Sequence, residues 1–145
     1  MNISLRVLIK HLVIAILTAY FFNWLNKSFF NFKNSPQNDL KALTESTKNI
    51  IILIVGPFFE TLIYQLPLLY FRKTKTHWAI LIFMCLLFAL THLYNPIYFI
   101  FAFFLGLNFN LFFVKIKKGE NINEAFFLTF LLHFIFNLYG LLFIK

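Results

Sequence analysis

The fold is decided by apolar stretches, of which the clearest is PIYFIFAFFLGLNFNLFFV, residues 96–114. This stretch carries no charged residue, and its length is close to the roughly 20 residues that a helix needs to cross about 30 Å of hydrocarbon. Polar and apolar residues do not alternate along it, as they would in a strand of a membrane barrel. The stretch therefore predicts a transmembrane helix.

Four other apolar segments have a similar length and composition. Together they predict an all-α polytopic membrane protein, with about five transmembrane helices in one bundle. We expect a single membrane domain over residues 1–145, with residues 49–144 as its core, and a short interfacial helix over residues 40–48. The four segments are Leu5–Leu25, Asn49–Phe71, His77–Leu93 and Glu124–Ile144.

Composition excludes a water-soluble globule and a disordered chain. Of the 145 residues, 61% are hydrophobic and 12% are charged, against about 25% charged residues in an ordinary soluble domain. The net charge of +8 comes from basic residues that cluster between the apolar segments, which indicates membrane lipids as partners rather than nucleic acid. Cys85 is the single cysteine, so an intramolecular disulfide and a multi-cysteine metal site are both excluded.

The distribution of Lys and Arg predicts the orientation. With the N-terminus inside, the inner regions hold eight basic residues and the outer regions hold five, of the 13 in the chain. The first segment lacks an obvious small-residue cleavage site and is interpreted as an uncleaved span. We expect an integral protein of a bacterial inner (plasma) membrane with its N-terminus inside.

Polar residues at membrane depth are the candidates for function, because an ionisable group there is costly. Glu60 lies near the middle of the second segment, His92 at the end of the third, and His133 near the middle of the fifth. Asn137 follows His133 by four residues, so both lie on one helix face. No Lys or Arg lies at the depth of Glu60, so these four residues are expected to form one polar cluster.

Structural roles compete with this interpretation. A lone histidine within a span is often a packing residue, and an asparagine there often joins two helices through hydrogen bonds. Asn108 and Asn110 are placed in that class, although Asn108 could also line a cavity. His11 and His77 are interpreted as interfacial residues at span ends.

Several chemistries are excluded by the residues present. No serine lies well inside a span, Asp39 is the only aspartate, and no H-E-x-x-H sequence occurs, which argues against serine, aspartyl and zincin-type membrane proteases. A proton-coupled carrier subunit stays open, because Glu and His carry protons in membranes. The lack of an inverted repeat disfavours a typical transporter.

The candidate residues also fall into three motifs in a recognisable order. The chain resembles the CPBP intramembrane proteases, relatives of the type II CAAX prenyl endopeptidases that are also called Abi proteins. The first motif of that family is normally two glutamates, three residues and an arginine. The other two are F-x-x-x-H and H-x-x-x-N. The matching stretches are GPFFETLIYQ (56–65), FALTH (88–92) and HFIFN (133–137).

This resemblance implies an intramembrane endopeptidase. Glu60 and His92 would activate a water molecule, and His133 and Asn137 would stabilise the oxyanion. It implies no metal and no cofactor. The substrate would be a peptide or protein, which can be lipid-modified.

Two departures from the family pattern leave an alternative open. Thr61 stands where the second glutamate is usual, and Gln65 where the arginine is usual. Together, these two departures replace one negative and one positive group of the usual motif, so the net charge around Glu60 is unchanged. This fits an active site in which Glu60 is intact. It also fits a non-catalytic relative that acts as a membrane immunity or binding protein. We favour the enzyme.

A difference in depth accompanies these assignments. Glu60 lies about 16 Å along its segment at 1.5 Å per residue, whereas His92 lies almost at the end of its own. We therefore expect the turn at residues 94–96 to be sunk into the protein.

Overall fold

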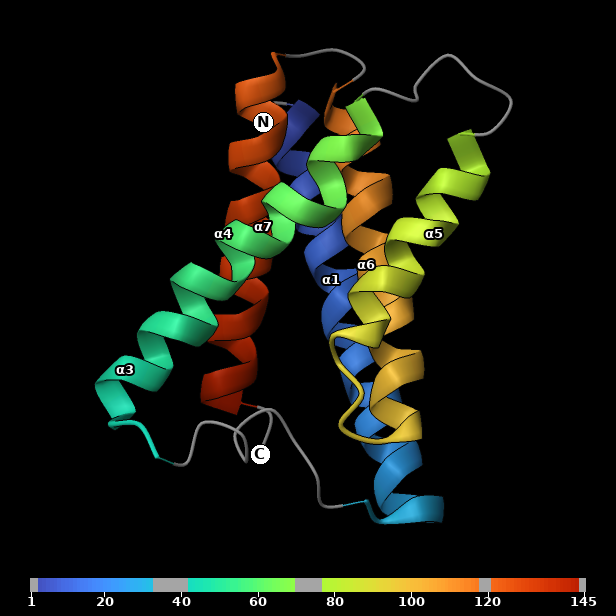
Figure 1. Ribbon diagram of the computed structural model, residues 1–145, viewed down its shortest axis with the longest axis vertical. Coiled ribbons are helices and arrows are strands. Elements are labelled where there is room, and N and C mark those ends of the chain that lie inside the picture. The colour runs from blue at the N-terminus through green and yellow to red at the C-terminus, as the bar shows by residue number, and fades with distance from the viewer. Residues whose placement is uncertain (1–2, 33–41, 70–76, 118–120, 144–145) are drawn as a thin grey trace.

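The computed structural model describes residues 3–32, 42–69, 77–117 and 121–143, and every regular element among them is helical. The prediction of an all-α bundle is confirmed for these residues (Figure 1). The helices are α1 (Ile3–Leu25), which the π turn η1 (Asn26–Phe30) extends, a composite second helix (Glu45–Leu69), α5 (His77–Leu90), α6 (Pro96–Lys117) and α7 (Ile122–Phe143).

The second helix is assembled from five consecutive pieces. It begins after Thr44, whose hydroxyl accepts a hydrogen bond from the backbone N–H of Thr47 at 3.3 Å and so caps the helix. The interfacial helix expected over residues 40–48 is therefore wrong for the part that is described, since the helix begins at Glu45 and runs on into the span; residues 40 and 41 lie outside the described residues. The pieces are α3 (Glu45–Ile50), the π turn η2 (Ile51–Val55), α4 (Gly56–Glu60), the π turn η3 (Thr61–Gln65) and the 3-10 turn η4 (Leu66–Leu69).

Four of the described helices are long and apolar enough to cross a membrane. They are α1 with its π extension, the second helix, α6 and α7. The remaining helix, α5, has 14 residues, which gives it a length of about 21 Å. The span expected over residues 77–93 is shorter than predicted, because the helix ends at Leu90 and a turn occupies residues 91–95.

Helix α6 lies at the centre of the bundle. It packs against α1, α5 and α7, and 56% of its apolar stretch is buried, against 22% to 28% in the other three long helices. Three of its phenylalanines, Phe109, Phe112 and Phe113, are fully buried. Phe88 and Phe136 are buried on α5 and α7, whereas many other phenylalanines outside α6 are exposed, as expected of side chains that face lipid.

One hydrogen-bonded pair joins α1 to α6. The Nδ1 atom of His11 lies 2.8 Å from Oδ1 of Asn108, and the Asn108 amide nitrogen donates to the His11 carbonyl at 2.9 Å. The expectation that His11 is interfacial is therefore wrong: the residue is buried, because Asn108 satisfies its ring and its backbone together. Asn108 therefore joins two helices, which is one of the two roles expected of it.

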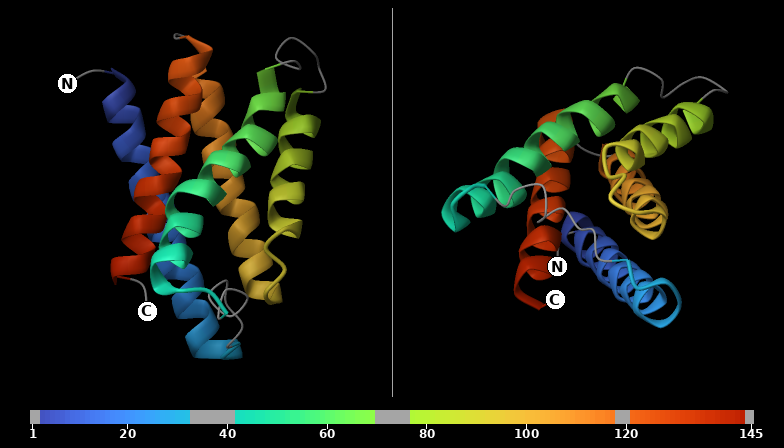
Figure 2. Two further views of the ribbon diagram at one scale, coloured as in Figure 1. Left: turned by 60° about the vertical axis from the view of Figure 1, so that its left-hand side comes forward. Right: turned by 60° about the horizontal axis from the view of Figure 1, so that its bottom comes forward.

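The geometry of two helices brings the candidate residues to one level. The second helix runs obliquely across the bundle, and α5 lies beside α6 in both views (Figures 1 and 2). Because α5 is short, the turn at residues 91–95 reaches the middle part of the oblique helix, where Glu60 lies. The depth of this turn in the bilayer stays a prediction.

Candidate active site

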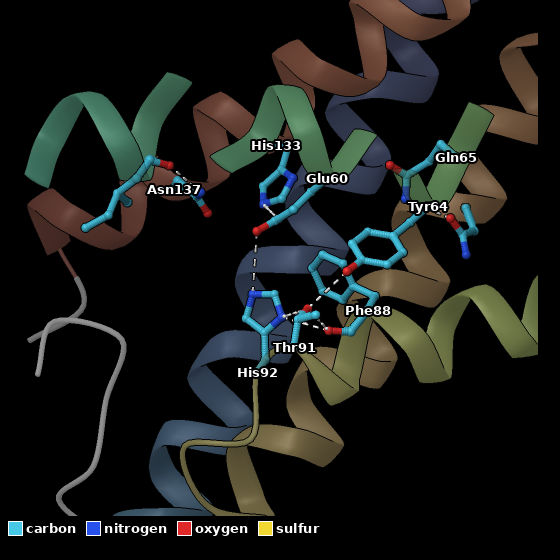
Figure 3. Close-up of polar contacts among 10 residues, drawn as sticks. Glu60, Tyr64, Gln65, Phe88, Thr91, His92, His133 and Asn137 are labelled. Atoms are coloured by element: carbon cyan, nitrogen blue, oxygen red, sulfur yellow. Dashed lines mark hydrogen bonds and ion pairs between the residues drawn. The ribbon is translucent and has the colours of Figure 1, made fainter. Parts of the chain in front are cut away.

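Glu60 is the last residue of α4 and lies between the two π turns. Its carboxylate faces two histidines from different parts of the chain (Figure 3). Oε1 lies 3.9 Å from Nε2 of His92, and Oε2 lies 3.4 Å from Nε2 of His133. The carboxylate lies above Gly56, one helical turn earlier, where a Cβ would come within 3.8 Å of Oε1. The structure thus brings together the one acidic and the two imidazole groups that were expected to cluster.

His92 is held in the turn that follows α5. Its Nδ1 lies 2.7 Å from the carbonyl oxygen of Phe88, so Nδ1 carries the hydrogen and donates it. In the neutral ring, Nε2 then carries a lone pair and points toward Glu60. The backbone therefore fixes both the orientation of this imidazole and its tautomer.

Two hydroxyl groups support this arrangement. The Thr91 hydroxyl donates to the Phe88 carbonyl at 2.8 Å and lies 3.2 Å from Nδ1 of His92. The Tyr64 hydroxyl donates to Thr91 at 3.3 Å from the second helix. Neither Tyr64 nor Thr91 was identified from the sequence. The signal was their position: Tyr64 follows Glu60 by four residues on the same helix face, and Thr91 precedes His92.

His133 is the most enclosed member of the site. It lies on α7 and is 3% exposed. Its ring centroid is 4.5 Å from that of Phe109 and 6.2 Å from that of Phe88. Aromatic packing on these sides restricts the ring, and the free direction of Nε2 is toward Glu60.

Phe88 lies next to both histidines and is itself positioned by a glycine. Its ring centroid is 4.5 Å from that of His92. A Cβ built on Gly106 of α6 would lie 3.0 Å from Phe88 Cδ1, so the glycine allows α5 and α6 to approach closely without displacing the Phe88 ring. The packing of α5 on α6 thereby sets the position of His92.

Asn137, the fourth expected residue, is in contact with the backbone of the second helix. Its amide nitrogen donates to the Ile52 carbonyl at 2.8 Å. Figure 3 shows this side chain to one side of the group formed by Glu60, His92 and His133. The structure therefore brings three of the four residues together and places the fourth on the same face of α7, one turn away.

The two altered motif positions are both buried. Gln65 donates to Oδ1 of Asn110 at 2.8 Å, and the Asn110 amide nitrogen donates to Cys85 Sγ at 3.2 Å. The Thr61 hydroxyl is buried without a hydrogen-bond partner among the described residues. Gln65, at the position where the motif usually has arginine, thus makes an uncharged hydrogen bond between helices, and Asn110 has the helix-joining role expected of it.

Comparison with known proteins assigns the family. A family model described as "Type II CAAX prenyl endopeptidase Rce1-like" matches residues 44–139. Comparisons with curated proteins and with solved structures give no match. The matched region begins at the start of the second helix and includes all three motifs, α5, α6 and most of α7. It covers well over half of the chain, and the resemblance inferred from the motifs is confirmed. The chain is an integral membrane protein that belongs to the Rce1-like family of type II CAAX prenyl endopeptidases.

Proposed function

We propose that the protein is an intramembrane endopeptidase in which Glu60 and His92 activate a water molecule. The observation that carries the proposal is the placement of one carboxylate within 3.9 Å and 3.4 Å of two imidazole nitrogens. These groups come from α4, from the turn that follows α5 and from α7. A partly buried carboxylate in an apolar helix, with two imidazole partners, is costly to assemble without a function.

The 3.9 Å between Glu60 Oε1 and His92 Nε2 exceeds a direct hydrogen bond and suits a water that donates to both atoms. The carboxylate takes one proton while the water oxygen attacks the peptide carbonyl carbon. The same proton is then delivered to the leaving amine nitrogen, so that hydrolysis consumes one water. Glu60 is thus the general base and then the general acid.

His133 is the residue proposed to stabilise the oxyanion. Its Nε2–H faces the site from the opposite side to His92, and burial among phenylalanines excludes water that would weaken such a bond. Zinc is not proposed, because the resemblance to the CPBP proteases favours a water molecule activated directly by Glu60 and His92. Asparagine would also be a poor fourth zinc ligand.

The proposed substrate is a peptide segment presented at the membrane. A lipid-modified C-terminus is the substrate class that the family description names. We propose that the protein lies in a bacterial inner membrane. Its N-terminus is placed inside, because the regions assigned to that side hold more basic residues. Thr61 and Gln65 are proposed to be neutral support residues, since the Gln65–Asn110 hydrogen bond leaves no buried charge that requires the usual arginine.

Cleavage of reporter peptides by purified protein in lipid nanodiscs tests the proposal. The peptides carry a C-terminal cysteine with or without a farnesyl group. Glu60→Gln keeps the shape of the side chain but cannot accept a proton, so we expect a loss of about 10²–10⁴-fold in kcat.

The matched control is Glu45→Gln, which removes an exposed carboxylate outside the site and should cleave like the parent. A Glu60→Gln variant that cleaves as well as the parent contradicts the mechanism. A folded parent that cleaves no peptide supports the alternative of a non-catalytic relative.

A further inference from the structure

One backbone carbonyl of the second helix accepts a hydrogen bond from a different helix. In a regular α-helix the Ile52 carbonyl would accept from the N–H of residue 56, and in a π turn from that of residue 57. The Gly56 N–H donates instead to the Ile51 carbonyl, and Pro57 has no N–H. The donor that reaches Ile52 is the Asn137 amide nitrogen, at 2.8 Å.

The π turn at residues 51–55 determines where Glu60 points. A π turn holds one residue more than an α turn, and each residue advances a helix by about 100° at 3.6 residues per turn. If the turn returned to α geometry, residues after it would rotate by about that angle relative to α7. The Glu60 carboxylate would then leave the two histidines.

Helix α7 contacts the second helix at two points, one within this π turn and one at the end of α4. His133 meets Glu60 at 3.4 Å, and Asn137 meets Ile52 at 2.8 Å. The two α7 residues are four positions apart, and their partners on the second helix are eight positions apart. The later residue of α7 meets the earlier residue of the second helix, so the two helices run in opposite directions here. Such a pair of contacts fixes both the register and the rotation of the segment from Ile52 to Glu60.

We propose that Asn137 is a positioning residue, which holds the π turn by serving the Ile52 carbonyl and thereby directs Glu60 toward His92 and His133. Its contribution to cleavage rests on the proposed function, but its effect on Glu60 does not. This role differs from the oxyanion contact that the motif implies. It follows from an amide that is turned toward the backbone of the second helix (Figure 3).

The test is a double-substitution cycle between Asn137 and Pro57. Asn137→Leu keeps the approximate size of the side chain and removes the donor. Pro57→Ala supplies a backbone N–H at the position from which a π turn serves the Ile52 carbonyl. We expect Asn137→Leu to lower kcat about 10²-fold at unchanged KM in the parent, and less than about tenfold in the Pro57→Ala background.

A second measurement needs no activity. In protein labelled with ¹⁵N-histidine, the imidazole signal of His133 reports the nearby carboxylate, and Glu60→Leu gives the signal without it. We expect Asn137→Leu to move the His133 signal toward the Glu60→Leu position, and Pro57→Ala to restore it.

The matched control is Tyr139→Phe, which removes another hydrogen bond between α7 and a neighbouring helix, the 2.9 Å bond to Tyr20. It should leave the His133 signal unchanged, and thermal unfolding verifies that each variant is folded.

Two results would overturn the proposal. One is an Asn137→Leu variant whose His133 signal matches that of the parent. The other is an equal loss of kcat on Asn137→Leu in the parent and in the Pro57→Ala background, which would assign Asn137 to stabilisation of the oxyanion. If the parent is inactive but the His133 signals follow the expected pattern, the proposed function fails and the positioning role stands.

Discussion

At the scale of single residues, the site depends on the absence of a side chain at Gly106. A Cβ there would lie 3.0 Å from Phe88 Cδ1 and 3.3 Å from Cγ. The Phe88 ring would have to shift by a few tenths of an ångström, and this shift would disturb the ring of His92, which it contacts. We expect Gly106→Ala to lower kcat about 10- to 100-fold in the peptide assay, because small displacements of catalytic groups are costly.

The control for this substitution is another glycine on a neighbouring helix. A Cβ at Gly140 of α7 meets nothing within 4 Å. Gly140→Ala should retain full activity and stabilise the helix by about 0.5–1 kcal/mol, since alanine is the better helix former. Equal activity in both variants would show that Phe88 does not position His92.

The residues of the site were predictable to different degrees. Glu60, His92 and His133 were identified because a carboxylate within an apolar segment requires polar partners, and these were the ionisable candidates. The contact of Asn137 with Ile52 was not predictable, because it depends on a carbonyl that a π turn releases. His11 was misplaced because its partner, Asn108, is 97 residues away.

At the scale of helices, Asn110 joins three elements in the interior. It accepts from Gln65 of the second helix, donates to Cys85 of α5 and itself belongs to α6. Asn110→Ala would leave the buried Gln65 amide without its acceptor, at a cost of about 1–3 kcal/mol. We expect the helices to separate more often around Cys85, which is fully buried.

Alkylation of Cys85 measures this separation directly, because it is the single cysteine of the chain. The parent should react with N-ethylmaleimide only slowly, and Asn110→Ala about 5- to 150-fold faster, as 1–3 kcal/mol implies. Asn26→Ala, in the distant π turn η1, removes an exposed hydrogen bond from the asparagine side chain to the Phe32 carbonyl and should react like the parent. Equally slow alkylation in Asn110→Ala would mean that packing alone holds these helices.

Helix boundaries followed from apolar runs, whereas the local geometry of the second helix did not. Both π turns lie within an apolar sequence, IILIVGPFFETLIYQ, in which only Pro57 signals a departure from regular hydrogen bonding. A single proline does not specify where the extra residue is placed, since that depends on α7. The sequence also did not indicate that α5 ends at Leu90, because residues 91–94 could equally continue a helix.

At the scale of the whole molecule, an apolar composition predicted the class of fold, and three ordered motifs predicted the family. The arrangement around α6 was not predictable, because nearly all segments are apolar on every side and the sequence does not distinguish lipid-facing from buried phenylalanines. The buried positions Phe109, Phe112 and Phe113 differ from their exposed counterparts only in their neighbours in space.

The 14-residue length of α5 has a consequence for the surrounding lipid. At about 21 Å this helix falls about 9 Å short of a 30 Å hydrocarbon layer, and such hydrophobic mismatch is relieved by local thinning of the bilayer. Thinning beside the turn at residues 91–95 would bring interfacial water close to His92 and Glu60, which hydrolysis requires.

Acyl-chain length should therefore affect the rate of the proposed cleavage. We expect faster cleavage in short-chain than in long-chain phosphatidylcholine nanodiscs, with Glu60→Gln inactive in both. A rate that is independent of chain length would mean that water reaches the site by a route that the bilayer does not control. Where the expectation holds, the thickness of the host membrane becomes a physical control on when this peptidase acts.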